Sequence, residues 1–101
     1  MSKQFVIRAR TEGSDGQRVP LGSRSEIIES LALCNTIAEI EGGDDLWGPG
    51  IRIELPPDTD PVTQMLLVIV EDEIAWLPIV RLAKKFDWSV MDIETGRELQ
   101  P

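Results

Sequence analysis

Apolar residues recur along this chain with two different periods, and this mixture constrains the fold more than any other feature. Residues 4–10 and 51–55 alternate between apolar and polar side chains, as strands with one buried face do. Residues 24–35 and 75–86 instead place apolar side chains at the spacing of helices. Both periods in one chain of 101 residues indicate a single α+β domain over residues 1–101.

The first helical segment opens with the capping-box sequence Ser-Arg-Ser-Glu at residues 23–26. In this motif the oxygen of Ser23 accepts a hydrogen bond from a free backbone N–H group, and the side chain of Glu26 reaches back to the first residue. We expect the helix to end near Asn35, a residue that tolerates the C-terminal position. Its predicted core-facing stripe is Ile27, Ile28, Leu31 and Cys34.

The second helix is expected to begin near Ala75, because Pro78 would clash with the preceding turn of a helix that began at Asp72. Acidic residues 71–73 before it and two lysines in its last turn both suit the helix dipole. Trp88, which follows the helix, is expected in the core. The predicted core-facing stripe of the helix is Trp76, Ile79, Val80, Ala83 and Phe86.

Three further segments can be assigned from pattern and composition. Residues 36–41 and 88–93 alternate as strands do, with Ala38 and Ile40 on one face of the earlier segment. Residues 42–50 contain four glycines and a proline, a composition that predicts a loop.

Residues 65–70 admit two interpretations. A helix could start at Pro61 with Asp60 as its N-terminal cap. The run Leu-Val-Ile-Val at residues 67–70 is largely β-branched and is bounded by charge, which instead favours a strand buried on both faces. We adopt the strand and keep the helix as the alternative.

The order of these elements predicts a ferredoxin-like split βαβ sandwich, in which two helices cover one face of a four- or five-stranded, mainly antiparallel sheet. The first strand would then lie beside the third, so that Arg8 and Arg10 face Glu54. Arg52 would face one of the two acids in residues 39–41. Such pairs of opposite charge across strands disfavour slipped registers.

The composition excludes several classes of catalytic and metal site. The chain has no histidine, so it has no Ser-His-Asp or Cys-His nucleophile and no His-ligated zinc. Its single cysteine, Cys34, allows no intramolecular disulfide, and we expect it as a small buried side chain in a reducing compartment. Signatures of phosphate-binding loops and nucleophile elbows are also absent. We therefore expect no catalytic residue and no cofactor.

The charge of the chain restricts its partners. Eighteen acidic and 10 basic residues give a net charge of −8, which opposes binding to nucleic acid and to anionic membranes. The predicted sheet face also lacks the aromatic side chains that RNA-binding modules of this topology use. The charge fits either solubility alone or a basic protein partner. We interpret the basic cluster of Arg81, Lys84 and Lys85 as a solvated helix face.

Trp47 is the strongest candidate for a contact residue. It lies in the predicted Gly/Asp/Pro loop, next to the acids Asp44 and Asp45, and tryptophan is common among interface anchors. The other interpretation, which the usual burial of tryptophan favours, is that Leu46 and Trp47 fold back together and close one end of the core. We assign Trp47, Asp44 and Asp45 as the predicted partner-binding residues.

Loop carboxylates are the remaining material for a metal site. Asp58 and Asp60 could offer oxygen ligands to Mg²⁺ or Ca²⁺, but their spacing does not match a calcium-binding loop. Each also has an ordinary role in a turn or a cap. We predict no metal site and keep these two residues as weak candidates.

Residues 80–96, VRLAKKFDWSVMDIETG, resemble the ending of many small bacterial proteins of unknown function. In those proteins a Leu-Ala-rich helix leads through a Gly-aromatic pair into an edge strand that ends in an Asp-x-x-Thr/Ser-Gly turn. Some are similar to immunity-type or other accessory proteins that bind a partner and lack catalysis. Asp87 stands where such sequences tend to have glycine and Ile93 where they tend to have proline. The resemblance covers about a fifth of the chain and transfers no functional residue.

The sequence thus predicts a small cytoplasmic protein-interaction or accessory module with an acidic surface, since no signal segment or membrane span is visible in it. We expect a monomer or a weak homo-oligomer that associates through the balanced sheet face. The alternative is a domain that binds a small ligand or a divalent cation through loop carboxylates, with or without catalysis.

Overall fold

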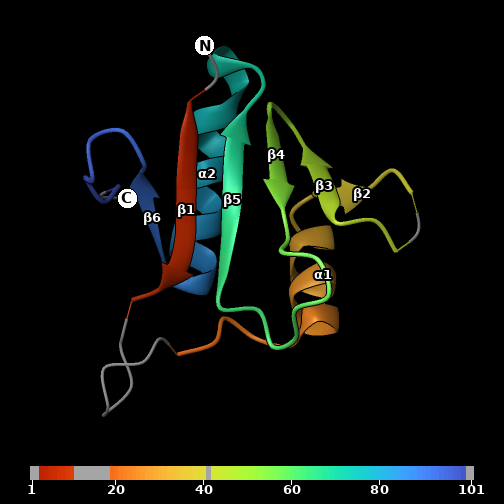
Figure 1. The fold of residues 1–101 in the computed structure, drawn as a ribbon. Coiled ribbons are helices and arrows are strands. Elements are labelled where there is room, and N and C mark those ends of the chain that lie inside the picture. The colour runs from red at the N-terminus through yellow and green to blue at the C-terminus, as the bar shows by residue number, and fades with distance from the viewer. Residues whose placement is uncertain (1–2, 11–18, 41, 100–101) are drawn as a thin grey trace.

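The computed structural model describes residues 3–10, 19–40 and 42–99, which form a six-stranded antiparallel sheet covered on one face by two helices (Figure 1). The strand order across the sheet is β2-β3-β4-β5-β1-β6. In chain order the elements are β1 (Gln4–Ala9), α1 (Arg24–Ala32), β2 (Ile37–Ala38), β3 (Asp45–Gly48), β4 (Ile51–Glu54), β5 (Gln64–Ile69), α2 (Asp72–Phe86) and β6 (Trp88–Asp92). The predicted α+β class is confirmed, whereas the ferredoxin-like topology is not, because the strand count and order differ.

The strand β5 occupies the middle of the sheet, between β4 and β1. The prediction of a strand here is confirmed for residues 65–69, and Leu67, Val68 and Ile69 are all buried, but Val70 lies beyond the strand and is exposed. A segment that is apolar on both faces gains most from a central position, where neighbours cover both faces. This insertion separates β1 from β4, so that β1 pairs with β5 and β6 instead.

The predicted cross-strand charge pairs are therefore wrong. Arg8 lies opposite Gln64 and Ser89 rather than Glu54. Arg52 lies opposite Trp47 and forms an ion pair within its own strand. Cross-strand charge pairs contribute only a few tenths of a kcal/mol, too little to decide the strand order against the burial of β5.

Several ion pairs form near the ends of strands. The guanidinium of Arg52 contacts Glu54 at 3.1 Å. That of Arg10 contacts Asp87 at 2.9 Å and Glu98 at 2.9 Å. Arg10 thus ties the end of β1 to the residues around β6.

The strand β3 lies within residues that we predicted to be a loop. Leu46 points into the core and is paired with Ile53 of β4. Trp47 lies on the open face of the sheet and is paired with Arg52. A tight turn through Pro49 and Gly50 joins the two strands, and Gly50 has a φ of +73°. Proline followed by a glycine with positive φ is the sequence of a type II turn, so the composition marked a hairpin instead of an open loop.

The strand β2 is shorter than predicted, with only Ile37 and Ala38 of residues 36–41 in the sheet. Ile40 lies beyond the strand and is exposed instead of sharing a buried face with Ala38. Residue 41 lies outside the described part of the chain.

The helix α1 confirms the predicted capping box. The backbone N–H of Glu26 donates to the oxygen of Ser23 at 3.2 Å, and the N–H of Ser23 donates to the Glu26 carboxylate at 3.2 Å. The pKa of Glu26 lies below its ordinary value. The larger cause is the hydrogen bond from the Ser23 side chain, and the smaller is the one from the Ser23 backbone. Ile27 and Leu31 are buried as expected, and Asn35 takes a left-handed conformation with φ of +58°.

The helix α2 begins at Asp72, three residues before the predicted start, and contains Pro78 in its interior. The helix continues past the missing N–H bond because buried side chains on both sides of the proline hold it to the sheet. The fully buried positions are Ala75, Ile79, Leu82 and Ala83. No helix among the described residues is both long and apolar enough to cross a membrane.

The predicted stripe of α2 is wrong at Trp76, which is 38% exposed. The buried positions of α2 face the sheet, and Trp76 is not one of them. Its ring meets the ring of Phe5 edge-on, with 5.8 Å between the two ring centres. The ammonium of Lys3 lies 5.9 Å from the centre of the same ring. Trp88 is buried as expected and stacks on Phe86.

The capping box gives a first prediction. Replacing Ser23 with alanine should lower the free energy of unfolding by roughly 1 kcal/mol, since a helix N–H loses its acceptor. It should also move the pKa of Glu26 up toward its ordinary value. A carboxyl pKa that folding lowers stabilises the fold above its unfolded value and loses that effect as pH falls through its folded value. The difference in unfolding free energy between the unchanged chain and the Ser23→Ala variant should therefore become smaller at acid pH.

Urea unfolding at several pH values and an NMR titration of the Glu26 carboxyl measure both effects. Ser25→Ala is the matched control, because among the described residues the hydroxyl of Ser25 forms a hydrogen bond only with that of Ser23. Equal losses of stability in the two variants would contradict the role of the cap.

Candidate functional site

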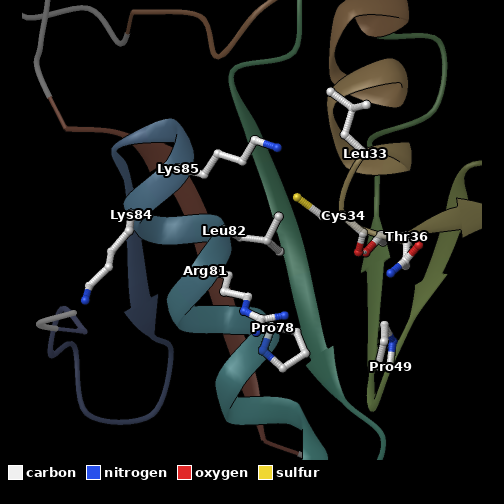
Figure 2. A pocket seen from close by; sticks show the side chains of 10 residues that line it. Leu33, Cys34, Thr36, Pro49, Pro78, Arg81, Leu82, Lys84 and Lys85 are labelled. Carbon is white, nitrogen blue, oxygen red and sulfur yellow. Dashed lines mark hydrogen bonds between the residues drawn. The ribbon is translucent and has the colours of Figure 1, made fainter.

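Residues 33–40 and 42–48 contribute to the lining of two surface hollows. The first is a cleft of about 510 Å³ between the C-terminal end of α1, the side of α2 and the turn at Pro49 (Figure 2). The second is a hollow of about 370 Å³ beside the β2–β3 connection. The two hollows carry charges of opposite sign.

The second hollow brings together the three predicted partner-binding residues. Trp47, Asp44 and Asp45 all line it, together with Glu39 and Ile40. Trp47 is half-buried, and the guanidinium of Arg52 stacks over its ring at 5.4 Å from the centre. We name this hollow, lined by Glu39, Ile40, Gly43, Asp44, Asp45 and Trp47, the acidic hollow.

The alternative prediction for Trp47 is wrong in part. Leu46 does close the core, where it is fully buried, but Trp47 points to the opposite face of the sheet. Successive side chains of a strand point to opposite faces, so both residues could fold inward only if this segment were a loop.

The two aspartates of the acidic hollow differ in their surroundings. The carboxylate of Asp44 forms an ion pair with Arg24, whose guanidinium also donates to the carbonyl of Pro56 at 2.9 Å. Asp44 therefore holds the start of α1 against the sheet. Asp45 is exposed, and within the described residues no basic side chain lies within 4.0 Å of its carboxylate.

The weak metal candidates are placed in turns near the same end of the fold. The carboxylate of Asp60 accepts a hydrogen bond from the backbone N–H of Arg24 at 3.1 Å, at the start of α1. Asp58 is exposed, with a left-handed φ of +53°. In the part of the chain that the structure describes, no three Asp, Glu or Cys side chains are placed to share a metal ion.

Three large aliphatic side chains are exposed along residues 33–40: Leu33 lines the first hollow, Ile40 lines the second, and Ile37 lies in β2. Leu33 is 74% exposed, Ile37 59% and Ile40 76%. The strand β2 is at the end of the strand order, so one side of its backbone has no neighbouring strand among the described residues. The sequence carried a signal for two of these residues, because Leu33 lies off the predicted helix stripe and Ile37 off the predicted buried face.

The cleft between the helices contains the basic cluster. Arg81, Lys84 and Lys85 are its charged residues, and the described part of the chain contributes no acid to its lining. Figure 2 shows the side chains of Arg81 and Lys85 on the side of α2 that faces Cys34, whereas Lys84 extends away from Cys34. We name the space lined by these residues the basic cleft.

The prediction for Cys34 is wrong, because this residue forms part of the floor of the basic cleft. Its thiol was expected to be buried, but it is only partly buried and lines the cleft opposite Leu82 (Figure 2). The basic cluster is exposed as predicted, yet it borders a concave surface. Sequence periodicity places residues on one helix face and does not show that the end of α1 lies across from it.

Comparison of the chain with models of known protein families, with curated proteins and with solved structures finds no match. The resemblance of residues 80–96 to accessory proteins therefore stays a prediction. At Asp87, where those sequences tend to have glycine, the backbone is left-handed with φ of +54°. Glycine takes that conformation without steric cost, so the departure leaves the helix end in place at some expense of stability.

The position of the hairpin that borders the basic cleft gives a second prediction. The carbonyl of Gly50 accepts hydrogen bonds from the N–H groups of Val70 and Glu71, at 2.8 and 3.1 Å, where α2 begins. A Cβ at Gly50 would lie 2.9 Å from the Glu71 carbonyl and 3.0 Å from the Ala75 nitrogen. Alanine should therefore push the hairpin away from α2.

Gly42→Ala is the matched control, because Gly42 also has a positive φ, of +78°, but open space around its Cβ position. In urea unfolding, Gly42→Ala should lose about 1 kcal/mol from the strained φ alone. Gly50→Ala should lose roughly 1–3 kcal/mol more, the usual range for overpacking. Equal losses would show that the close approach to α2 is unimportant.

Proposed function

We propose that this chain is a non-catalytic, cytoplasmic module that binds another protein through the sheet edge formed by residues 33–40 and 42–48. The observation that carries the proposal is the exposure of Leu33, Ile37 and Ile40 within eight residues. Single exposed aliphatic residues are ordinary, but a group of them on one surface marks an interaction site. The free edge of β2 adds backbone groups that a partner strand can pair with.

The acidic hollow gives this surface a preference for a basic partner. Asp45 and Glu39 are exposed beside the apolar residues, and the whole chain carries a charge of −8. Charges at the rim of an interface steer the approach of a partner and select its sign. Trp47 supplies a half-buried aromatic surface of the kind that anchors interfaces.

The resemblance of residues 80–96 to immunity-type and accessory proteins favours the same function. Such proteins act by occupying a partner and need no reacting groups of their own. The sequence agrees with this, since it has no histidine and no nucleophile motif.

Site-specific photo-crosslinking tests the proposal. A benzoylphenylalanine residue placed at Ile37 or at Ile40 should form an adduct of one discrete mass in an extract of the cells that naturally produce the protein. The same residue at Ile93 is the control, because Ile93 is also exposed but follows β6 at the opposite end of the strand order. No adduct at either edge position, or equal adducts at all three positions, would reject the interface.

The sign of the partner's charge is tested in the same assay. Asp45→Asn should lower the adduct yield by roughly 1.5- to 5-fold, the range expected for one exposed charge. Asp58→Asn removes an equally exposed acid outside the acidic hollow and should leave the yield unchanged. Added salt should reduce the difference between the two variants, since exposed charges are screened.

A further inference from the structure

We propose that the basic cleft is a binding site for a small organic anion, a carboxylate or phosphate head on an apolar body. This site adjoins the protein-binding edge and shares Leu33 with it, but its cations belong to α2, outside that edge. The proposal rests on three properties of the cleft: the sign of its charges, the nature of its walls and the lack of carboxylate partners for Arg81 and Lys85 among the described residues. The ammonium of Lys85 does lie 5.7 Å from the centre of the Phe86 ring.

The charge of the cleft is opposite to that of the chain. Arg81 and Lys85 stand on one wall, and within the described residues no carboxylate lies within 4.0 Å of either. Arginine offers a planar fork of donors and lysine a point charge, which are the usual partners of carboxylate and phosphate groups. An anion between them would meet two cations and no acid from the cleft lining.

The walls beside these cations are apolar. Pro49, Pro78 and Leu82 line the cleft together with Leu33, and the partly buried thiol of Cys34 completes the floor. A volume of about 510 Å³ lies within the range of small-molecule sites, which combine apolar walls with a few convergent polar groups. Inorganic anions alone would leave most of this surface unused.

The end of α1 does not neutralise the cations. The carbonyl of Leu31 accepts from the N–H groups of Cys34 and Thr36, at 2.9 and 3.0 Å, and the carbonyl of Ala32 accepts from Asn35 at 3.1 Å. The carbonyl of Cys34 accepts from the hydroxyl of Thr36 at 3.2 Å. Among the described residues neither Arg81 nor Lys85 donates a side-chain hydrogen bond to these carbonyls or to any other group, so their donors remain available to a ligand.

Cys34 provides a direct reporter of occupancy. It is the only cysteine of the chain and it lines the cleft. A bound ligand should therefore slow its alkylation by N-ethylmaleimide, a neutral reagent. The same ligand should shift the backbone amide signals of residues 33–36 and 81–85 in NMR spectra.

The experiment titrates the folded chain with sodium octanoate and with octyl phosphate. We expect saturable protection of Cys34 and amide shifts confined to the cleft with at least one of the two anions. Octanol, which has the same tail without charge, and inorganic phosphate, which has the charge without a tail, should each bind at least about tenfold more weakly.

Paired variants locate the site. The double variant Arg81→Gln and Lys85→Gln should weaken binding of the better anion by at least about tenfold, since it removes both charge-assisted contacts. Arg97→Gln is the matched control, because it removes an exposed cation that does not line the cleft. Circular dichroism should show that each variant keeps its fold.

Several outcomes would overturn the proposal. If octanol bound as tightly as octanoate, the cleft would be an apolar surface that does not recognise the anionic group. Inorganic phosphate as tight as octyl phosphate would show that the apolar walls take no part. An equal loss in the Arg97→Gln variant, or no protection of Cys34 by either amphiphile, would remove the site.

Discussion

The burial of β5 on both of its faces is the constraint on which the rest of the structure depends. Leu67 and Ile69 pack under the helices, while Val68 is covered on the open face by its neighbours Arg52 and Gln4. Each such side chain contributes on the order of 1.5–3 kcal/mol when it is buried, against a few tenths for a charge pair on the surface. The strand must therefore have neighbours on both sides, which places it between β4 and β1 and fixes which strands are left at the edges.

The position of the hairpin β3–β4 follows from that arrangement. Because β4 pairs with β5, the turn after β3 arrives at the start of α2, and Gly50 allows the two backbones to approach each other. At Gly48 a Cβ would lie 2.5 Å from the hydroxyl of Thr36, so this glycine brings the hairpin close to the end of α1 as well. The basic cleft is the space that these two contacts leave between α1 and α2. Its shape thus depends on two glycines that periodicity arguments treat only as signs of a loop.

Local chemistry predicted the elements better than their arrangement. The cap at Ser23 and the alternation in residues 51–55 are decided by neighbouring residues, and both were predicted correctly. The strand β3 was missed because two alternating residues between glycines carry too little periodicity. The predicted residues Trp47, Asp44 and Asp45 do meet in one hollow, since they are adjacent in the chain. The basic cleft could not be predicted, because its two walls are distant in sequence and meet only through the packing of the helices.

The net charge of −8 describes the whole chain and conceals how its charges are distributed. Basic residues in the last turns of α2 stabilise the negative end of the helix dipole, and the same residues give the cleft its positive sign. At physiological ionic strength charges interact strongly only within roughly 8 Å, so a small anion in the cleft responds to Arg81 and Lys85. A long polyanion would extend beyond them and meet the surrounding acids. The anion site proposed for the basic cleft would therefore select ligands by size, favouring a small carboxylate or phosphate over a polyanion.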